Sequence, residues 1–586
     1  MKNRIRKEES GSGNRADDSC QRTGAESTAS KTVNLRLRKV VFFPPWLFLM
    51  CLVIISLVNS DAFVAGLDIV TDWILNNFAW AFDLTTLGCV FGVLLAFISP
   101  LGKVRIGGSK AHPKMTFIDL VWITLCTTIA AGILLWASAE PLYHLYSPAA
   151  SAEVESGSAG AAIFAMETMY LEWTWSPYAI DTVGALLFAF VFYNMHQRFS
   201  IGSMFVPLFG EKVRKYDNVI DLICLFSLVL GMSSCLGMGT LTIAGGIENL
   251  FGVESGPTLW FFVIVVVVIT FIISSVSGVF RGIRMLSRVN ARIYIILLAF
   301  LFILGPTTFI LNFSTESLGE FARDFLQMSL MTGEAYGDSW AKSWPCFYWC
   351  NWLAWAPVIG VFLGKILYGY TIRDAIICNF FIPSIFVTIW MSVFSSSAIY
   401  YEWEGVGLYD LLLESGEGSV VYGVFDQLPL SLLLTVVYLF IVFISFVTSA
   451  DSNTNVMAGL CTDGLTEDNQ ESKAWLKVLW GISVGAMTWI LISFAGIDGI
   501  KAAANLGGFP NMFLMILMLI VLFKISWNPA KYDVHKEDYD SFGHPLPSKR
   551  LSVESPVKKD GKKKFGFRKE PPEEEPETET VKSENS

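Results

Sequence analysis

The sequence predicts an all-α, polytopic membrane protein that crosses the bilayer about twelve times. Apolar residues make up 53% of its 586 residues, whereas charged residues make up only 16%. Successive apolar runs reach the length of about 20 residues that a helix needs to cross a bilayer. The loops between these runs are basic on alternate sides, which is typical of a multi-pass membrane protein.

Each predicted helix is an apolar run bounded by polar, glycine- or proline-containing loops. The expected spans lie near residues 41–60, 79–99, 116–139, 170–194, 218–245, 258–278, 290–312, 344–368, 374–399, 429–449, 474–496 and 500–525. Together they form one transmembrane domain over residues 39–525. Residues 1–38, rich in serine, glycine and charge, are expected to be disordered. Residues 526–586 form a charged tail in which a basic run precedes an acidic one.

Basic residues predict how the chain is oriented in the membrane. Lys and Arg gather in the loops after the second, fourth, sixth and eighth spans, whereas the loop after the third span has none. The positive-inside rule therefore places both termini in the cytoplasm. We expect a multi-pass protein of the plasma membrane, which is the inner membrane if the source is a bacterium.

The composition and motifs disfavour several classes of function. A net charge of -10 argues against nucleic-acid binding. No GxxxxGK[ST] run is present, and the five histidines and ten cysteines form no ligand or disulfide pattern. Because no group of side chains suggests catalysis, we expect neither an enzyme nor an organic cofactor. The expected partners are a small solute and the lipid bilayer.

Four tryptophans lie within the fourteen residues from Trp344 to Pro357, in the eighth predicted span. Trp349, Trp352 and Trp355 follow one another at intervals of three, so their indoles cover one broad helix face. Indole faces attract a quaternary ammonium through the ring quadrupole, although that group donates no hydrogen bonds. These residues are therefore either interfacial or packing tryptophans, or part of an aromatic box in a transporter.

The fourth predicted span contains Trp173, Pro177, Tyr178 and Asp181. A helix bent by the proline could direct the two rings and the carboxylate toward one volume. A carboxylate inside the membrane costs at least a few kcal/mol and indicates a candidate functional site. The alternative is that Asp181 lies near the membrane surface and caps a helix after Pro177.

Two other segments suggest a cation site. Small residues at Ala130, Ala131 and Gly132 allow the third span to unwind, although ordinary helix packing uses such residues as well. Thr448 and Ser449, at the end of the tenth span, could donate hydrogen bonds to their own helix. With carbonyl groups of an unwound third span, their hydroxyls could instead form a hard-oxygen site for a cation.

Several segments resemble the betaine/choline/carnitine transporter family, in the family's order and over nearly all of residues 40–525. They are Glu140–Leu142, Gly282–Asn290, the tryptophan run, Thr371–Arg373 and Thr448–Ser452. The resemblance implies the sodium-symporter (LeuT-like) fold, in which spans 3–7 and 8–12 form two inverted five-helix repeats around a midplane substrate site. It also implies a homotrimer.

The resemblance implies substrate-site residues, position by position. The matching positions are Trp173, Tyr178, Asp181, Trp349, Trp352, Trp355, Ala130, Ala131 and Gly132. The family usually has a third ring where this chain has Asp181, which leaves both the substrate and the coupling ion open. Gly132 is the one family glycine retained in the third span, and it favours a substrate with its own carboxylate. Asp181 favours a substrate without one, so the two clues conflict.

Sodium is the coupling ion that the resemblance implies. One family sodium site corresponds to backbone or hydroxyl oxygens of Cys126, Ile129, Ser445, Thr448 and Ser449. A second family site is expected to be lost, because Leu228 and Met232 stand where hydroxyls are needed. Ion-free exchange through a fixed arginine is also disfavoured, since residues 216–280 contain no Lys or Arg. Symport with one sodium ion is the first expectation, and proton coupling through Asp181 is the second.

The resulting prediction is a secondary-active transporter that imports a quaternary-ammonium or related onium compound by alternating access. Glycine betaine, carnitine and choline are the expected substrates, and a sulfonium analogue stays open. A carrier of the same fold for another amine, an amino acid or a nucleobase would need polar groups that an aromatic pocket lacks. A pore or a transport-dead sensor is a different class, which accumulation of solute against its gradient would exclude.

Overall fold

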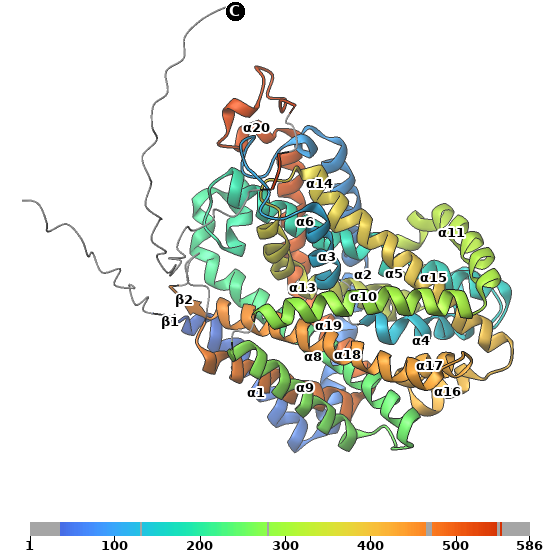
Figure 1. Ribbon diagram of the computed structural model, residues 1–586. Helices are drawn as coiled ribbons and strands as arrows, with labels where there is room; N and C mark the ends of the chain where they lie inside the picture. Colours follow the sequence, from blue (N-terminus) through green and yellow to red (C-terminus); the bar gives the residue numbers. More distant parts are fainter. Residues whose placement is uncertain (1–34, 129–131, 278–279, 465–471, 548–550, 554–586) are drawn as a thin grey trace, which may run out of the picture.

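The computed structural model describes residues 35–128, 132–277, 280–464, 472–547 and 551–553, and these residues are almost entirely helical. The strands found among them are β1 (Arg36–Leu37) and β2 (Thr462–Asp463), which pair antiparallel. The predicted all-α membrane fold is confirmed. Figure 1 shows long helices packed into one bundle, with α20 at one end of it.

The helices of ten or more residues in the described ranges are α1 (Lys39–Val58), α2 (Ser60–Ile98), α3 (Phe117–Thr128), α4 (Gly132–Tyr146), α5 (Ala159–Trp173), α6 (Trp175–Ala189), α8 (Asp217–Phe251), α9 (Pro257–Ser277), α10 (Phe280–Leu304), α11 (Thr307–Ser329), α13 (Pro345–Ile366), α15 (Ile382–Trp403), α17 (Glu417–Asp426), α18 (Ser431–Leu460) and α19 (Ala474–Trp527). Shorter ones are α7 (Val206–Phe209), α12 (Trp340–Ser343), α14 (Ile372–Ile376), α16 (Leu408–Ser415) and α20 (Pro529–Tyr532).

Within the described residues, nine helical stretches are long and apolar enough to cross a membrane. A tenth is counted if α10 and α11, which are bent by 104° at their junction, form one broken span. The two last predicted spans are joined in α19, whose backbone leaves helical geometry at Gly496 (φ 55°, ψ -137°). The third predicted span is divided into α3 and α4, which lie on either side of residues 129–131. The total of twelve spans and the inverted repeats stay predictions.

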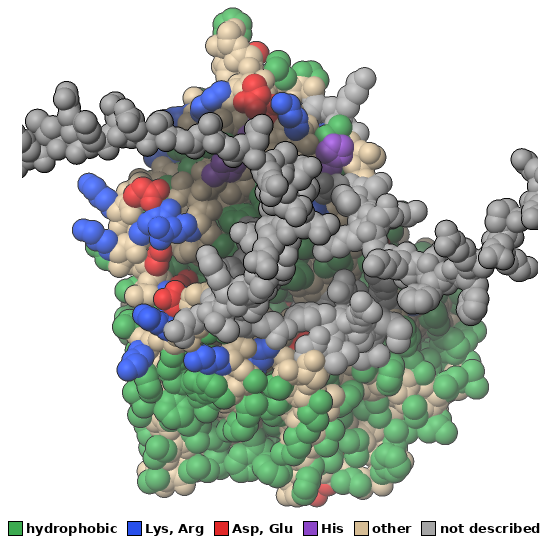
Figure 2. Space-filling view, turned by 60° about the vertical axis from the view of Figure 1, so that its left-hand side comes forward, with side chains coloured by type: hydrophobic (Ala, Val, Ile, Leu, Met, Phe, Trp, Pro, Cys, Tyr) green, Lys and Arg blue, Asp and Glu red, His purple; other side chains and the backbone are tan. Residues whose placement is uncertain are grey.

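The surface carries the apolar exterior of a membrane protein. Residues such as Val58, Ile98 and Ile303 are largely exposed on α1, α2 and α10, although they are strongly apolar. Figure 2 shows hydrophobic side chains covering the lower part of one face, with Lys and Arg gathered above them. Exposed apolar side chains of this extent are stable only where lipid tails replace water.

Close backbone contact between α6 and α13 brings the candidate site together. A Cβ atom on Gly360 would lie 2.7 Å from the Cα atom of Gly184, and one on Gly184 would lie 3.0 Å from the carbonyl oxygen of Ala356. Glycines at such positions allow helix backbones to approach closely within the membrane. The residues of α6 and α13 that flank this contact are held in a fixed relative position.

We predict that Gly360→Ala destabilises the protein by about 2 kcal/mol, because its methyl group would overlap the α6 backbone, which cannot move away easily. The measurement is the apparent melting temperature of the detergent-purified protein. Gly319→Ala is the matched control, since a Cβ on this α11 glycine has no other atom within 4 Å. Equal melting temperatures for the two variants would contradict the proposed contact.

Candidate substrate site

A break between α5 and α6 separates Trp173 from Tyr178 and Asp181. Thr174 lies at the break with non-helical dihedrals (φ -112°, ψ -101°). Pro177 explains its location, because the proline ring has no N–H and clashes with the carbonyl four residues earlier. Trp173 therefore ends α5, and the two other residues lie in the first two turns of α6.

Two pairs of aromatic rings join these helices to α13. The ring centroids of Trp173 and Tyr348 are 4.9 Å apart, and those of Tyr178 and Trp352 are 5.7 Å apart. All four side chains are buried. Tyr348 and Trp352 lie one helical turn apart, so the two pairs are neighbours. We call these four rings the aromatic cage.

Tyr348 is a member of the cage that the sequence analysis missed. Its sequence signal is its spacing: Tyr348, Trp352 and Trp355 lie at i, i+4 and i+7, which share a helix face more closely than positions at intervals of three. Trp355, on the same helix, is half-buried. It lies against α8, because a Cβ atom added to Gly231 of α8 would be 3.0 Å from Nε1 of Trp355.

Trp349 turns toward α2. Its Nε1–H donates a hydrogen bond of 3.0 Å to Oδ1 of Asp83, and both side chains are buried. Asp83 is a second residue that the sequence analysis missed, although a lone carboxylate in an apolar span was a signal for it. The Trp349 indole is thus held by a carboxylate on a helix outside the cage, and its role as a substrate contact stays a prediction.

Glu140, on α4, holds the first ring pair in place. Its Oε2 atom accepts a hydrogen bond of 3.0 Å from the Trp173 indole and a second one from the Tyr348 hydroxyl. Glu140 is fully buried. Because one carboxylate accepts a hydrogen bond from each ring, it fixes the orientation of both side chains.

Asp181 lies inside α6, six residues after its first residue, and is 1% exposed. The alternative that it caps a helix at the membrane surface is therefore not supported, because Thr174 occupies the N-cap position. Neither carboxylate oxygen has a hydrogen-bond partner among the described residues. A buried carboxylate in this state requires either a proton or a cation to be stable.

The third-span residues are only partly described. Gly132 begins α4, and a Cβ on it would lie 3.2 Å from Cη2 of Trp173, so the backbone lies directly against the cage. Ile129, Ala130 and Ala131 lie outside the described residues, as does the side chain of Cys126.

The hydroxyl residues of the expected sodium site lie on α18. The Thr448 hydroxyl donates a hydrogen bond of 2.9 Å to the Ile444 carbonyl and lies 3.1 Å from the Ser445 carbonyl. The lone pairs of the Thr448 hydroxyl oxygen are therefore left to accept a cation. The Ser449 hydroxyl accepts from Asn453 at 3.3 Å. Helix α10 packs against both α3 and α18, and the meeting of the α3 carbonyl groups with the α18 hydroxyls stays a prediction. The oxygen donors present are those that sodium prefers.

The Ser445 side chain has a structural role that the sequence did not indicate. Its hydroxyl accepts a hydrogen bond of 2.7 Å from Asn290 and lies 2.9 Å from the Tyr294 hydroxyl, both on α10. These contacts join α10 to α18. The Ser445 carbonyl, rather than its hydroxyl, is the group that the sequence resemblance assigns to sodium.

Comparison with known proteins gives a consistent result. Residues 40–531 match the family model described as "BCCT, betaine/carnitine/choline family transporter". The chain is 29% identical over 469 residues to the glycine betaine transporter OpuD of Bacillus subtilis, covering 80% of this chain and 90% of that protein. It is 26% identical to an ectoine/hydroxyectoine transporter of Virgibacillus pantothenticus, covering 82% of this chain and 95% of that one. It is 27% identical to the osmo-dependent choline transporter BetT2 of Acinetobacter baylyi, covering 83% of this chain and 71% of that protein.

Proposed function

The chain belongs to the betaine/carnitine/choline transporter family, and we propose that it is a secondary-active transporter that imports an onium compound by alternating access. The expected substrates are glycine betaine, carnitine and choline. The observation that carries the proposal is the aromatic cage: two buried ring pairs, Trp173–Tyr348 and Tyr178–Trp352, contributed by three different helices. A quaternary ammonium loses water on entering such a site, and the ring faces replace it by cation–π attraction.

The cage also explains how the site would open. Trp173 belongs to α5, Tyr178 to α6, and both partners to α13. Because α6 and α13 are in close backbone contact, these two helices would move together against the rest of the bundle, and the Tyr178–Trp352 pair would move with them as one unit. In transporters built from broken helices, movement of one bundle against the other exposes a midplane site alternately to the two sides. We expect a homotrimer, as the family resemblance implies.

We propose one sodium ion as the coupling ion, held in part by the oxygens of Thr448 and Ser449. The support is their chemistry: the Thr448 hydroxyl hydrogen is used within α18, so its oxygen is left as an acceptor. The second candidate is proton coupling through Asp181. One observation favours it: both buried carboxylate oxygens of Asp181 lack a hydrogen-bond partner among the described residues.

The test is accumulation of radiolabelled glycine betaine, carnitine and choline by proteoliposomes under an imposed sodium or proton gradient. We predict that a sodium gradient drives accumulation, and that Thr448→Val raises the sodium concentration for half-maximal uptake at least tenfold. Thr315→Val is the matched control, because Thr315 makes the same bond to its own helix, to the Leu311 carbonyl, at an exposed position of α11.

Three other results would change the proposal. Accumulation driven by a proton gradient, and lost in Asp181→Asn, would favour the second candidate. Equilibration without accumulation would indicate a pore, and the absence of uptake and of binding for every onium compound would overturn the transport proposal.

A further inference from the structure

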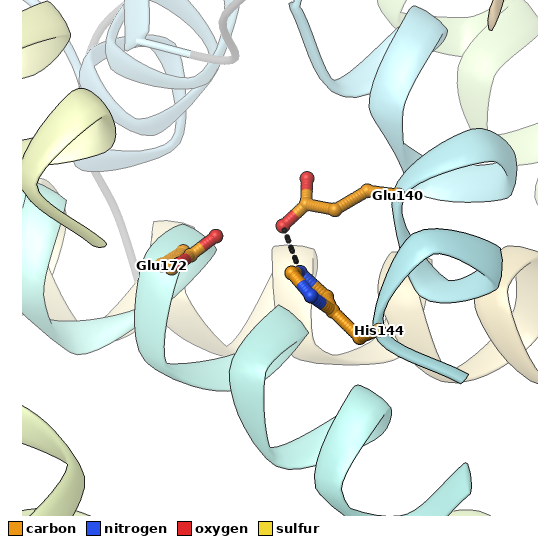
Figure 3. Close-up of side chains that lie close together, drawn as sticks. All are labelled: Glu140, His144 and Glu172. Carbon is orange, nitrogen blue, oxygen red and sulfur yellow. Dashed lines mark hydrogen bonds and ion pairs between the residues drawn. The ribbon is translucent and has the colours of Figure 1, made fainter. Parts of the chain in front are cut away.

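A buried polar cluster of α4 and α5 side chains adjoins Trp173. Glu140 and His144 lie one turn apart on α4, and Glu172 lies on α5, next to Trp173 in the chain. All three side chains are fully buried, and one oxygen or nitrogen atom from each lies within 4.8 Å of the others. Figure 3 shows the carboxylate of Glu172 directed across a gap toward that of Glu140, with the His144 ring beside them.

The tautomer of His144 follows from its partners. The Trp340 indole N–H, which is a donor only, lies 3.2 Å from Nδ1 of His144, so Nδ1 accepts. The ring hydrogen of a neutral His144 is then on Nε2, which lies 3.5 Å from Oε1 of Glu140. A metal ion among these residues would need the lone pair of Nε2, which carries this hydrogen. The arrangement therefore fits a proton better than a metal ion.

The two glutamates have very different surroundings. Glu140 faces three donors: the Trp173 indole, the Tyr348 hydroxyl and Nε2–H of His144. Neither oxygen of Glu172 has a hydrogen-bond partner among the described residues. The oxygens of Glu140 are thus satisfied by donors, whereas the buried oxygens of Glu172 lie near the Glu140 carboxyl group without a donor, where a proton or a nearby cation would compensate them.

The charges around the cluster agree with one proton on Glu172. The other titratable groups that face it in the described residues are Tyr143 on α4, Cys346 and Tyr348 on α13, Glu417 on α17, and Asp498 and Lys501 on α19. Glu417 accepts from the Tyr143 hydroxyl at 2.7 Å, and Asp498 is exposed. The Lys501 ammonium, which is half-buried, lies 3.6 Å above the Trp344 ring and is the cation of this group. This one cation faces several carboxyl groups, so none of its charge is reserved for Glu172.

We propose that Glu172 binds a proton while the aromatic cage is empty and releases it to water when an onium cation occupies the cage. The link is physical: Glu140 bonds to two cage rings, and Glu172 lies beside both Glu140 and Trp173. A positive charge against the Trp173–Tyr348 pair favours the ionised form of Glu172, because attraction is strong where water is excluded. The proposal rests on the proposed function, since it needs an onium ligand in the cage.

The sign of the pH effect follows from linkage. The loaded protein binds fewer protons than the empty protein, so affinity for the onium rises as pH rises through the titration of Glu172. The change is at most about tenfold per pH unit, because one proton is involved. At pH values where Glu172 is ionised in both states, the affinity becomes constant.

The test is calorimetric titration of the purified full-length protein with choline and with glycine betaine, from about pH 5 to about pH 9. Runs in buffers of different ionisation enthalpy count the protons released. We expect wild type to release up to about one proton per choline, and Glu172→Gln to release none and to bind with a pH-independent Kd. Glu167→Gln is the matched control, since Glu167 is another buried carboxyl group of α5 with an unpartnered oxygen, and it should keep the pH dependence. Asp181→Asn is measured beside it as the competing proton site.

Infrared difference spectra of the ligand-free protein give a second readout that does not depend on binding. A band from a protonated carboxylic acid that Glu172→Gln removes is expected. A pH-independent Kd in wild type, or a dependence that survives Glu172→Gln, would overturn this proposal and leave the proposed function intact. If the pH dependence of the Kd is lost in Asp181→Asn and kept in Glu172→Gln, the proton is bound by Asp181 and not by Glu172. Failure of choline and glycine betaine to bind at every pH would overturn the cage, and this linkage with it.

Discussion

Replacing Trp352 by alanine is expected to weaken the binding of glycine betaine by about thirtyfold or more. Trp352 is 5% exposed and lies with its ring centroid 5.7 Å from that of Tyr178. A cation–π contact in a desolvated site contributes about 2 kcal/mol, and about 1.4 kcal/mol corresponds to a tenfold change in affinity. Trp352→Phe keeps a ring in place, so its loss should be only a few-fold.

Fluorescence titration of the purified variants with glycine betaine measures this effect. Trp175→Ala is the matched control, because Trp175 lies at the start of α6 but is exposed and packs against Phe321 and Phe325 on the outside of the bundle. Its Kd should equal that of wild type. If Trp352→Ala melts normally and binds within threefold of wild type, Trp352 is not part of the onium site.

Hydropathy predicted the helices that lie in the bilayer but missed their extensions beyond it. The second span was expected at 79–99, yet α2 begins at Ser60, because a helix continues through polar residues such as Asp68 and Asp72 without losing its backbone bonds. The seventh expected span, 290–312, reaches only the first residues of α11, and the rest of this helix was not expected. It carries Glu316, Glu320 and Arg323 among its apolar residues, so an apolar-run criterion does not detect it.

The substrate site was predictable where it depends on residue type along one helix and not where it depends on contacts between helices. Tryptophans in the eighth span and Asp181 in the fourth were visible as unusual residues in apolar runs. The bonds from Trp349 to Asp83 and from Tyr348 to Glu140 join residues 266 and 208 positions apart. Nothing in a single sequence states that these helices meet. Glu140 contributed to the family resemblance, but its contact with the cage was not foreseen.

Replacing Glu140 by glutamine is expected to weaken onium binding at least tenfold, and Glu140→Ala to weaken it further. In wild type, one carboxylate oxygen accepts from Trp173 on α5 and from Tyr348 on α13, which form the first ring pair of the cage. A hydrogen bond to a charged group contributes about 1.5–3 kcal/mol, and a buried donor left without an acceptor costs about 1–3 kcal/mol. Glutamine can place its carbonyl oxygen where Oε2 accepts from both rings, but that oxygen carries no full charge, and its NH₂ group then replaces Oε1 and faces the Nε2–H of His144, a second donor.

Glu140 and its donors are buried, so Glu140→Ala is expected to lower stability as well as affinity. A melting curve of Glu140→Gln, measured beside its Kd, separates the two effects. Glu402→Gln is the matched control, since Glu402 accepts a 2.7 Å bond from the Tyr146 hydroxyl far from the cage rings. It should lower the melting temperature without changing the Kd for glycine betaine. A Glu140→Gln protein that melts lower but binds within threefold of wild type would make Glu140 a structural residue only. A raised Kd at an unchanged melting temperature identifies Glu140 as the residue that positions both cage rings.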